Sequence, residues 1–286
     1  MLYIQRVPAA PLSASIDTIW YCQNAPGPQT LQRVLPSGKA QLIVNLKEDE
    51  TRGYHIEGGR LCQTRSSGTV LTGVLTRYEL IDSAETEWIM GAVFRPGGMP
   101  ALFGIPAHET SDSDVSLDLL WGARARELRE RILAADSPAA KLDILVRALA
   151  ARWQPIAAHP AVTFALLEIG ANPCESKVAA ITESVGLSAK RFIEHFKGAV
   201  GVTPKQYCRI RRFQQVLAAA EQGKRVEWTR IAADCGYFDQ SHFIHDFRRF
   251  SGLTPTAYDA RRTEFRNHVK FLQSDMEALV RSCCHG

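Results

Sequence analysis

The 286-residue sequence predicts two domains. The first is a β-rich domain of the α+β class, for which a cupin-like fold is one alternative. The second is an all-α domain containing two helix-turn-helix units. Three observations predict this. The length suits two domains, the apolar periodicity changes from strand-like to helical near residue 117, and the second half contains an internal repeat. We place the domains at residues 1–155 and 159–263, with a helical tail at residues 264–286.

The first hundred residues have the pattern of a β-rich domain. Short apolar runs, such as residues 41–46 and 88–94, are separated by clusters of Gly, Pro and Ser. Beyond Leu117 the apolar residues recur with a helical period, which predicts two amphipathic helices around residues 128–133 and 142–149. This pattern stops at a pair of prolines, Pro155 and Pro160, which mark the boundary between the domains.

Composition excludes several classes of protein. Hydrophobic residues make up 45% and charged residues 22%, as in globular proteins. No run approaches the roughly 20 apolar residues of a membrane span, and the N-terminus lacks a signal-peptide pattern, so we expect a cytoplasmic protein with no membrane partner. The seven cysteines are scattered without a C-x-x-C pair, so we expect neither a metal site nor a disulfide framework, and no cofactor.

Positive charge is concentrated in the second half of the chain. Residues 1–155 contain 16 Lys and Arg against 17 Asp and Glu, a net charge of −1. Residues 177–262 contain 15 against 8, a net charge of +7. This asymmetry is typical of a module that binds a polyanion joined to a neutral domain, although a basic face is often only solvated.

The internal repeat predicts two copies of a helix, a tight turn and a second helix. Residues 179–186 align with residues 229–236 at an offset of 50. Later matches, including Phe192 with Phe243, have an offset of 51, because the second copy has one extra residue in its turn. Ser188 and Asp239 are placed to cap the second helix of each copy. A connecting helix from about residue 204 to residue 221 separates the two units.

The second helix of each unit has a polar face opposite its phenylalanines. The polar residues are Lys190, Arg191, Glu194 and Lys197 in the first unit, and Ser241, His242, His245 and Arg248 in the second. All eight side chains donate or accept hydrogen bonds, as contacts with bases and phosphates require. For a single unit, an ordinary solvated surface explains this pattern equally well. Two copies with a basic excess favour double-stranded DNA as the partner.

Residues 178–258 resemble the paired helix-turn-helix domain of AraC/XylS-type transcription regulators. The motifs that carry the resemblance are IAADCGYFDQSHFIHDFRRFSGLTPTAY at residues 231–258 and GLSAKRFIEHFKGAVGVTPKQYCRIRR at residues 186–212. The resemblance implies two recognition helices, at about residues 189–200 and 240–251, in successive major-groove segments about 34 Å apart. By position it implies base contacts from six residues: Lys190, Ile193, Glu194, Gln240, Ser241 and His245.

Two of these positions depart from the family pattern. Ile193 and Glu194 stand where basic or amide residues are common, which changes the bases read and not the act of binding, since Glu accepts from cytosine and an aliphatic chain contacts the thymine methyl. Arg209, Arg212 and Arg248 are predicted to contact phosphates, with solvated surface as the alternative for each.

The N-terminal half resembles, more loosely, the sensor domains of some AraC-type proteins, on residues 35–38, 94–98 and 116–122. The resemblance implies a small-molecule effector or a homodimer, and RNA polymerase as a partner of an activator; whether transcription is raised or lowered stays open. We name an effector pocket from the residues Trp20, Trp88, Phe94 and Arg95, with a place in the core as the alternative for most of them.

Two other functions compete with that of a specific transcription regulator. An alkyl-transferring enzyme needs an activated cysteine, and Cys22 and Cys62 are isolated, so we assign no catalytic residue and expect no enzyme. A nonspecific DNA- or RNA-binding protein is disfavoured by two different recognition faces.

The tail has an apolar stripe, which predicts a helix that packs on the chain itself or on a second copy. The residues of the stripe are Phe265, Val269, Leu272, Met276 and Leu279.

Overall fold

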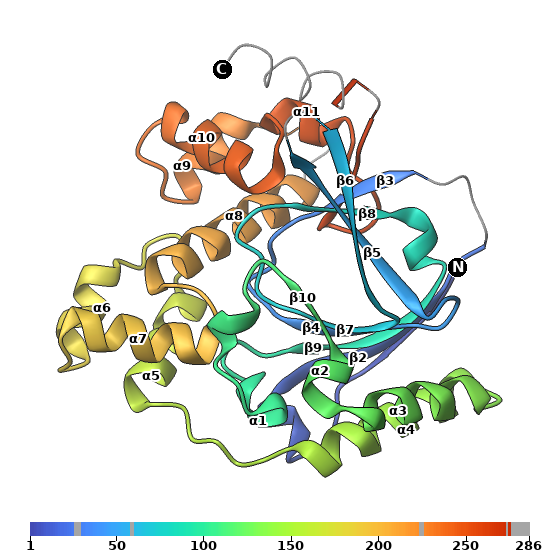
Figure 1. Ribbon diagram of the computed structural model, residues 1–286. Coiled ribbons are helices and arrows are strands. Elements are labelled where there is room, and N and C mark those ends of the chain that lie inside the picture. Colours follow the sequence, from blue (N-terminus) through green and yellow to red (C-terminus); the bar gives the residue numbers. More distant parts are fainter. Residues whose placement is uncertain (26–29, 58–59, 223–225, 273, 276–286) are drawn as a thin grey trace.

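A computed structural model describes residues 1–25, 30–57, 60–222, 226–272 and 274–275 (Figure 1). The predicted fold class is confirmed: a β-rich N-terminal part with two sheets is followed by a helical C-terminal part. Among the described residues, no helix has the length and apolar character needed to cross a membrane.

The two sheets are antiparallel and share strands from distant parts of the sequence. The six-stranded sheet has the order β1 (Leu2–Arg6), β2 (Ile16–Gln23), β9 (Trp88–Phe94), β4 (Gln41–Asn45), β7 (Thr69–Thr72) and β10 (Asp114–Ser116). The five-stranded sheet has the order β11 (His268–Lys270), β3 (Leu31–Val34), β8 (Glu79–Asp82), β5 (Glu50–Glu57) and β6 (Arg60–Ser67).

Helices cover one face of the six-stranded sheet. The chain passes through α1 (Pro100–Phe103), η3 (Ala107–Thr110) and α2 (Leu117–Trp121) to the predicted helix pair, α3 (Ala123–Ala134) and α4 (Pro138–Arg152). Lys141 joins this pair, because its Nζ donates to the Ile132 carbonyl at 2.7 Å and the Ala135 carbonyl at 2.8 Å, which satisfies carbonyls at the end of α3. Its ammonium also lies 5.5 Å from the centre of the Trp88 ring, so this face of β9 is turned toward α4.

The helical half contains the two predicted units. The helices are α5 (Pro160–Ala171), α6 (Val178–Ser184), α7 (Ala189–Val200), α8 (Pro204–Gln222), α9 (Trp228–Asp234), α10 (Gln240–Ser251) and α11 (Pro255–Asp259). The first unit is α6 and α7, the second is α9 and α10, and α8 connects them (Figure 1). As predicted, the Ser188 hydroxyl accepts from the Arg191 amide and the Asp239 carboxylate accepts from the His242 amide.

The tail contradicts the predicted helix where it is described. Residues 268–270 form strand β11, which pairs with β3 so that Val269 lies opposite Arg33 and is fully buried. A strand forms because β3 is otherwise the edge of its sheet, and because Val269 points inward between His268 and Lys270 with the period of a strand. Met276 and Leu279 lie outside the described residues.

The returning tail also neutralises a buried cation of the N-terminal part. The Arg33 side chain is 2% exposed and donates to Asp275 at 3.0 Å. Its guanidinium lies 4.6 Å from the centre of the Phe271 ring. The segment after the second unit is therefore part of the five-stranded sheet rather than a separate element.

Ending the chain at Thr263 is expected to lower the free energy of unfolding by about 3 kcal/mol, because β3 loses its neighbouring strand and Arg33 loses its ion pair with Asp275 and its contact with Phe271. Urea titration of the truncated and full chains measures the loss. A chain ending at Asp275 is the control, since it retains β11 and the ion pair. Equal stability of the two truncated chains would contradict a stabilising role for β11.

The N-terminal part contacts the two units at equivalent positions. The Ser111 hydroxyl donates to the Gly201 carbonyl at 2.6 Å, just after α7. Tyr78 packs on Gly252, just after α10, so closely that a Cβ there would lie 2.5 Å from the tyrosine ring. Gly201 and Gly252 correspond in the repeat, and both have the left-handed backbone that ends a helix, with φ of +103° and +70°.

Candidate nucleic-acid interface

In the first unit, the predicted recognition face is open to solvent. Helix α7 buries Phe192 and Phe196 fully and so turns its opposite side outward. On that side Lys190, Arg191, Ile193 and Glu194 are exposed, and Lys197 is half-buried. The Ser188 cap fixes where this helix begins, which places Lys190 and Arg191 in its first turn.

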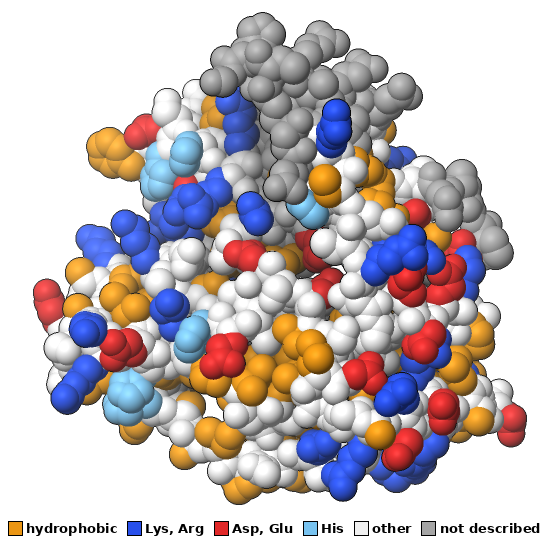
Figure 2. All heavy atoms as spheres, viewed as in Figure 1, with side chains coloured by type: hydrophobic (Ala, Val, Ile, Leu, Met, Phe, Trp, Pro, Cys, Tyr) orange, Lys and Arg blue, Asp and Glu red, His pale blue; other side chains and the backbone are white. Residues whose placement is uncertain are grey.

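The second unit repeats the arrangement on α10. Phe243 and Phe247 are buried, and the exposed side contains Gln240, Ser241, His242, His245 and Arg248. Figure 2 shows Lys, Arg and His side chains gathered on the left of the molecule, over the helical half. The structure thus turns outward the polar face that the sequence predicts for each unit.

Arg209, which is predicted to contact phosphate, also has a partner within the protein. Its guanidinium forms an ion pair and two hydrogen bonds with Asp246, whose side chain is 1% exposed on the inner side of α10. The hydrogen bond to Asp246 raises the pKa of Arg209 further above its usual value. A residue held in this way positions α10 against α8. The signal was available in the sequence, because Asp246 lies on the same stripe as Phe243 and Phe250.

Arg212, which is also predicted to contact phosphate, likewise has contacts within the protein. Its Nη2 donates to the Cys174 carbonyl at 3.3 Å, between α5 and α6, and its guanidinium lies 5.4 Å from the centre of the Tyr237 ring. Burial raises the pKa of the Tyr237 phenol, since the neutral ring is favoured in this packed position. Arg212 therefore joins the segment before the first unit to the turn of the second.

The turn of the second unit contains an exposed aromatic residue that the sequence reasoning missed. Phe238 is 95% exposed and lies immediately before the Asp239 cap of α10. Its neighbour Tyr237 is buried against Phe243 with a ring distance of 5.3 Å. The signal in the sequence was the change of repeat offset from 50 to 51 at this turn.

The four residues proposed for an effector pocket are not brought together. Phe94 is fully buried and packs edge-on against Phe103. Trp88 faces α4 and donates to the Tyr21 hydroxyl at 2.7 Å. Arg95 lies at the surface, where its Nε donates to the Ser13 carbonyl. Of these four residues, Trp20 lines the cleft described next.

That cavity is a cleft of about 1460 Å³ between the six-stranded sheet, β3 and α8. Its walls are mixed: Trp20 and Ile89 are apolar, whereas Lys39, Arg211 and Gln214 are polar or charged. The Gln214 side chain crosses from α8 to the N-terminal part by donating to the Pro36 carbonyl at 2.7 Å. A molecule in this cleft would contact both the sheet and the helix that connects the two units.

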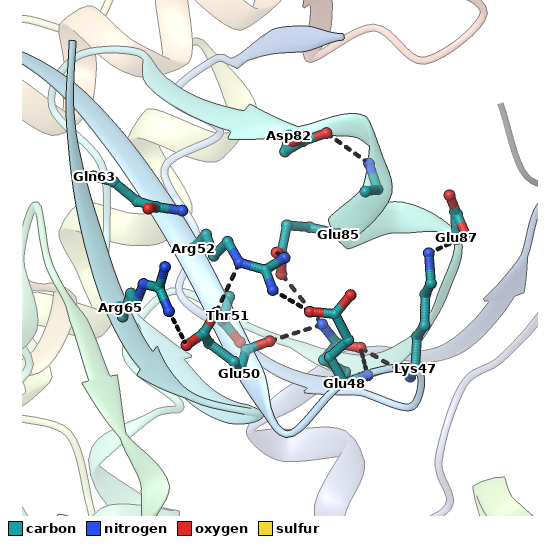
Figure 3. Close-up of polar contacts among 12 residues, drawn as sticks. Lys47, Glu48, Glu50, Thr51, Arg52, Gln63, Arg65, Asp82, Glu85 and Glu87 are labelled. Atoms are coloured by element: carbon teal, nitrogen blue, oxygen red, sulfur yellow. Dashed lines mark hydrogen bonds and ion pairs between the residues drawn. The ribbon is translucent and has the colours of Figure 1, made fainter. Parts of the chain in front are cut away.

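A group of charged residues is joined by ion pairs around β5 (Figure 3). Arg52 on β5 forms ion pairs with Glu48, with Glu50 at 2.7 Å and with Glu85 at 3.0 Å. Burial raises the pKa of Glu85, and Arg52 opposes that shift. One guanidinium is thus shared by three carboxylates, and it joins β5 to the segment before it and to η2 (Ser83–Thr86).

The part of the chain that the structure describes contains no group of three or more His, Cys, Asp and Glu side chains that could hold a metal ion. Cys22 is buried on β2, and Cys62 is half-buried on β6 at the edge of the other sheet. The two cysteines weighed for alkyl transfer are therefore on different sheets.

Comparison with known proteins agrees with this division. Residues 4–116 match a domain of unknown function, DUF6597, and residues 181–261 match a helix-turn-helix domain. The probable transcriptional regulator LumQ of Photobacterium leiognathi is 32% identical over 84 residues, which cover 28% of this chain and 32% of LumQ. The HTH-type transcriptional regulator GadX of Escherichia coli K12 is 37% identical over 57 residues, which cover 20% of this chain and 19% of GadX.

These curated relatives are matched over a third of their length or less. Two solved structures of ToxT from Vibrio cholerae, one apo and one with unsaturated fatty acid bound, are 10% identical with TM-scores of 0.44 and 0.41. Both alignments cover 90% of this chain, and 97% and 94% of the respective ToxT chains. From these matches, the chain carries a helix-turn-helix domain after a DUF6597 domain.

Proposed function

We propose that this chain is a sequence-specific transcription regulator that reads two successive major-groove segments with α7 and α10. The observation that carries the proposal is the pairing of two capped helices, each with buried phenylalanines on one side and exposed hydrogen-bonding residues on the other. In this proposal residues 159–263 bind DNA and residues 1–155 regulate the binding. Base readout is assigned to Lys190, Ile193 and Glu194 in α7 and to Gln240, Ser241 and His245 in α10.

We further propose that the cleft beside Trp20 is the effector site. Its combination of an indole, amide side chains and the Arg211 guanidinium suits a small molecule with both an apolar and an anionic part. Arg211 and Gln214 contribute to the wall from α8, and α8 is packed against both units. A molecule bound in the cleft would therefore contact α8, the helix that separates α7 from α10.

Lys190→Ala and His245→Ala are each expected to lose about 1–3 kcal/mol of binding free energy at a preferred duplex and to relax the preference at one base position. The duplex is recovered by repeated selection of the full wild-type chain from a random pool, and affinities are measured by titration at fixed salt. Arg248→Ala is expected to weaken binding to all duplexes alike and to reduce the salt dependence, because it contacts phosphate.

Arg147→Ala is the control, since Arg147 is exposed on α4 away from both units. Equal losses on every duplex for Lys190→Ala and His245→Ala would show that their side chains do not read bases. Failure of the wild-type chain to enrich any duplex would contradict the proposed function itself.

A further inference from the structure

The turn of the second unit contains an apolar side chain with no described residue covering it. Phe238 is 95% exposed, the largest exposure among the large hydrophobic residues that the structure describes. The first unit has no counterpart: there Leu187 follows the glycine, packs partly against the core and is followed at once by the Ser188 cap. Phe238 is therefore the extra residue of the second copy, inserted between Tyr237, which is packed in the core, and the cap.

The backbone on both sides of Phe238 is anchored. The Tyr237 amide donates to the Ala232 carbonyl at 3.0 Å, and the Tyr237 ring is buried. On the other side, the Asp239 carboxylate accepts from the His242 amide at 2.7 Å. The position of Phe238 relative to the start of α10 is therefore fixed by the fold, although its side chain has no partner in the described structure.

We propose that Phe238 makes an apolar contact with the deoxyribose backbone at the rim of the second major-groove segment. The inference rests on the proposed function, in which the first residues of α10 contact base edges. Phe238 lies two residues before Gln240, outside the helix and so at the rim, where the sugar–phosphate backbone runs. A phenyl ring has no hydrogen-bonding group for phosphates or polar base edges, so the apolar surface of the sugar is its complement.

Phe238→Ala in the full chain is expected to weaken binding to the selected duplex roughly tenfold, or about 1.4 kcal/mol. Because the ring neutralises no phosphate, the dependence of affinity on salt is expected to keep the wild-type slope. Because the sugar carries no sequence information, preferences at each base position are expected to stay unchanged. Phe238→Leu retains an apolar contact and is expected to recover most of the affinity.

Leu167→Ala is the matched control, since Leu167 is a 67% exposed apolar residue on α5. Leu167→Ala is expected to bind the selected duplex with wild-type affinity. The thermal unfolding temperatures of Leu167→Ala and Phe238→Ala are both expected to equal that of the wild type. Wild-type affinity for Phe238→Ala, a reduced salt slope, or a lost preference at a thymine would each overturn the sugar contact while leaving the proposed function intact. A wild-type chain that enriches no duplex would overturn both.

Discussion

Arg209→Met is expected to lower the free energy of unfolding by about 3 kcal/mol, the largest effect we expect of a single side chain in the helical half. The loss arises because Asp246 is 1% exposed and its negative charge stays buried when the guanidinium is removed. A long apolar side chain keeps most of the packing against Phe250, so the charge is the main variable. Urea titration followed by circular dichroism measures the change.

The control is Arg249→Met, an exposed arginine of α10, which is expected to stay within about 0.5 kcal/mol of the wild type. Combining Arg209→Met with Asp246→Leu is expected to recover most of the loss, since no charge is then left unpaired. If Arg209→Met kept full stability and only flattened the salt dependence of DNA binding, Arg209 would be a phosphate contact and not a positioning residue.

Gly252→Ala is expected to cost about 2–3 kcal/mol of stability, for two separable reasons. The left-handed backbone, with φ of +70°, costs a residue with a Cβ about 1 kcal/mol. The rest comes from Tyr78, whose ring would lie 2.5 Å from the new Cβ and must move. Thermal and urea unfolding of the full chain measure the total.

Gly186→Ala separates the two contributions. Gly186 also ends a helix with a positive φ, +66°, but a Cβ there meets nothing within 4 Å. Gly186→Ala is therefore expected to lower the free energy of unfolding only by the cost of the left-handed backbone, about 1 kcal/mol. In a Tyr78→Ala background, Gly252→Ala is expected to fall to the cost of Gly186→Ala. An undiminished cost in that background would show that Tyr78 does not press on the second unit.

Local signals in the sequence were sufficient to predict the two units. The caps Ser188 and Asp239 and the spacing of the phenylalanines act within one or two helical turns, and the observed α7 and α10 match the predicted helix bounds. The turn glycines Gly186 and Gly236 take the left-handed conformation for which glycine is suited.

Contacts between distant residues could not be predicted in this way. Strand β11 pairs with β3 across more than 230 residues of sequence. The apolar spacing of this segment suits a helix, but the open edge at β3 makes it a strand. The four residues named for an effector pocket are kept apart for a related reason. Trp20 and Trp88 are on neighbouring strands, and only the register between β2 and β9 shows that they point to opposite faces.

Ser111 and Tyr78 both belong to the N-terminal part, and each contacts the glycine that ends one of the two helices α7 and α10. A movement of the N-terminal part would therefore act on the ends of both helices at once. Exchanging the first 155 residues for those of a relative would replace both contacts while leaving every side chain proposed to read bases unchanged.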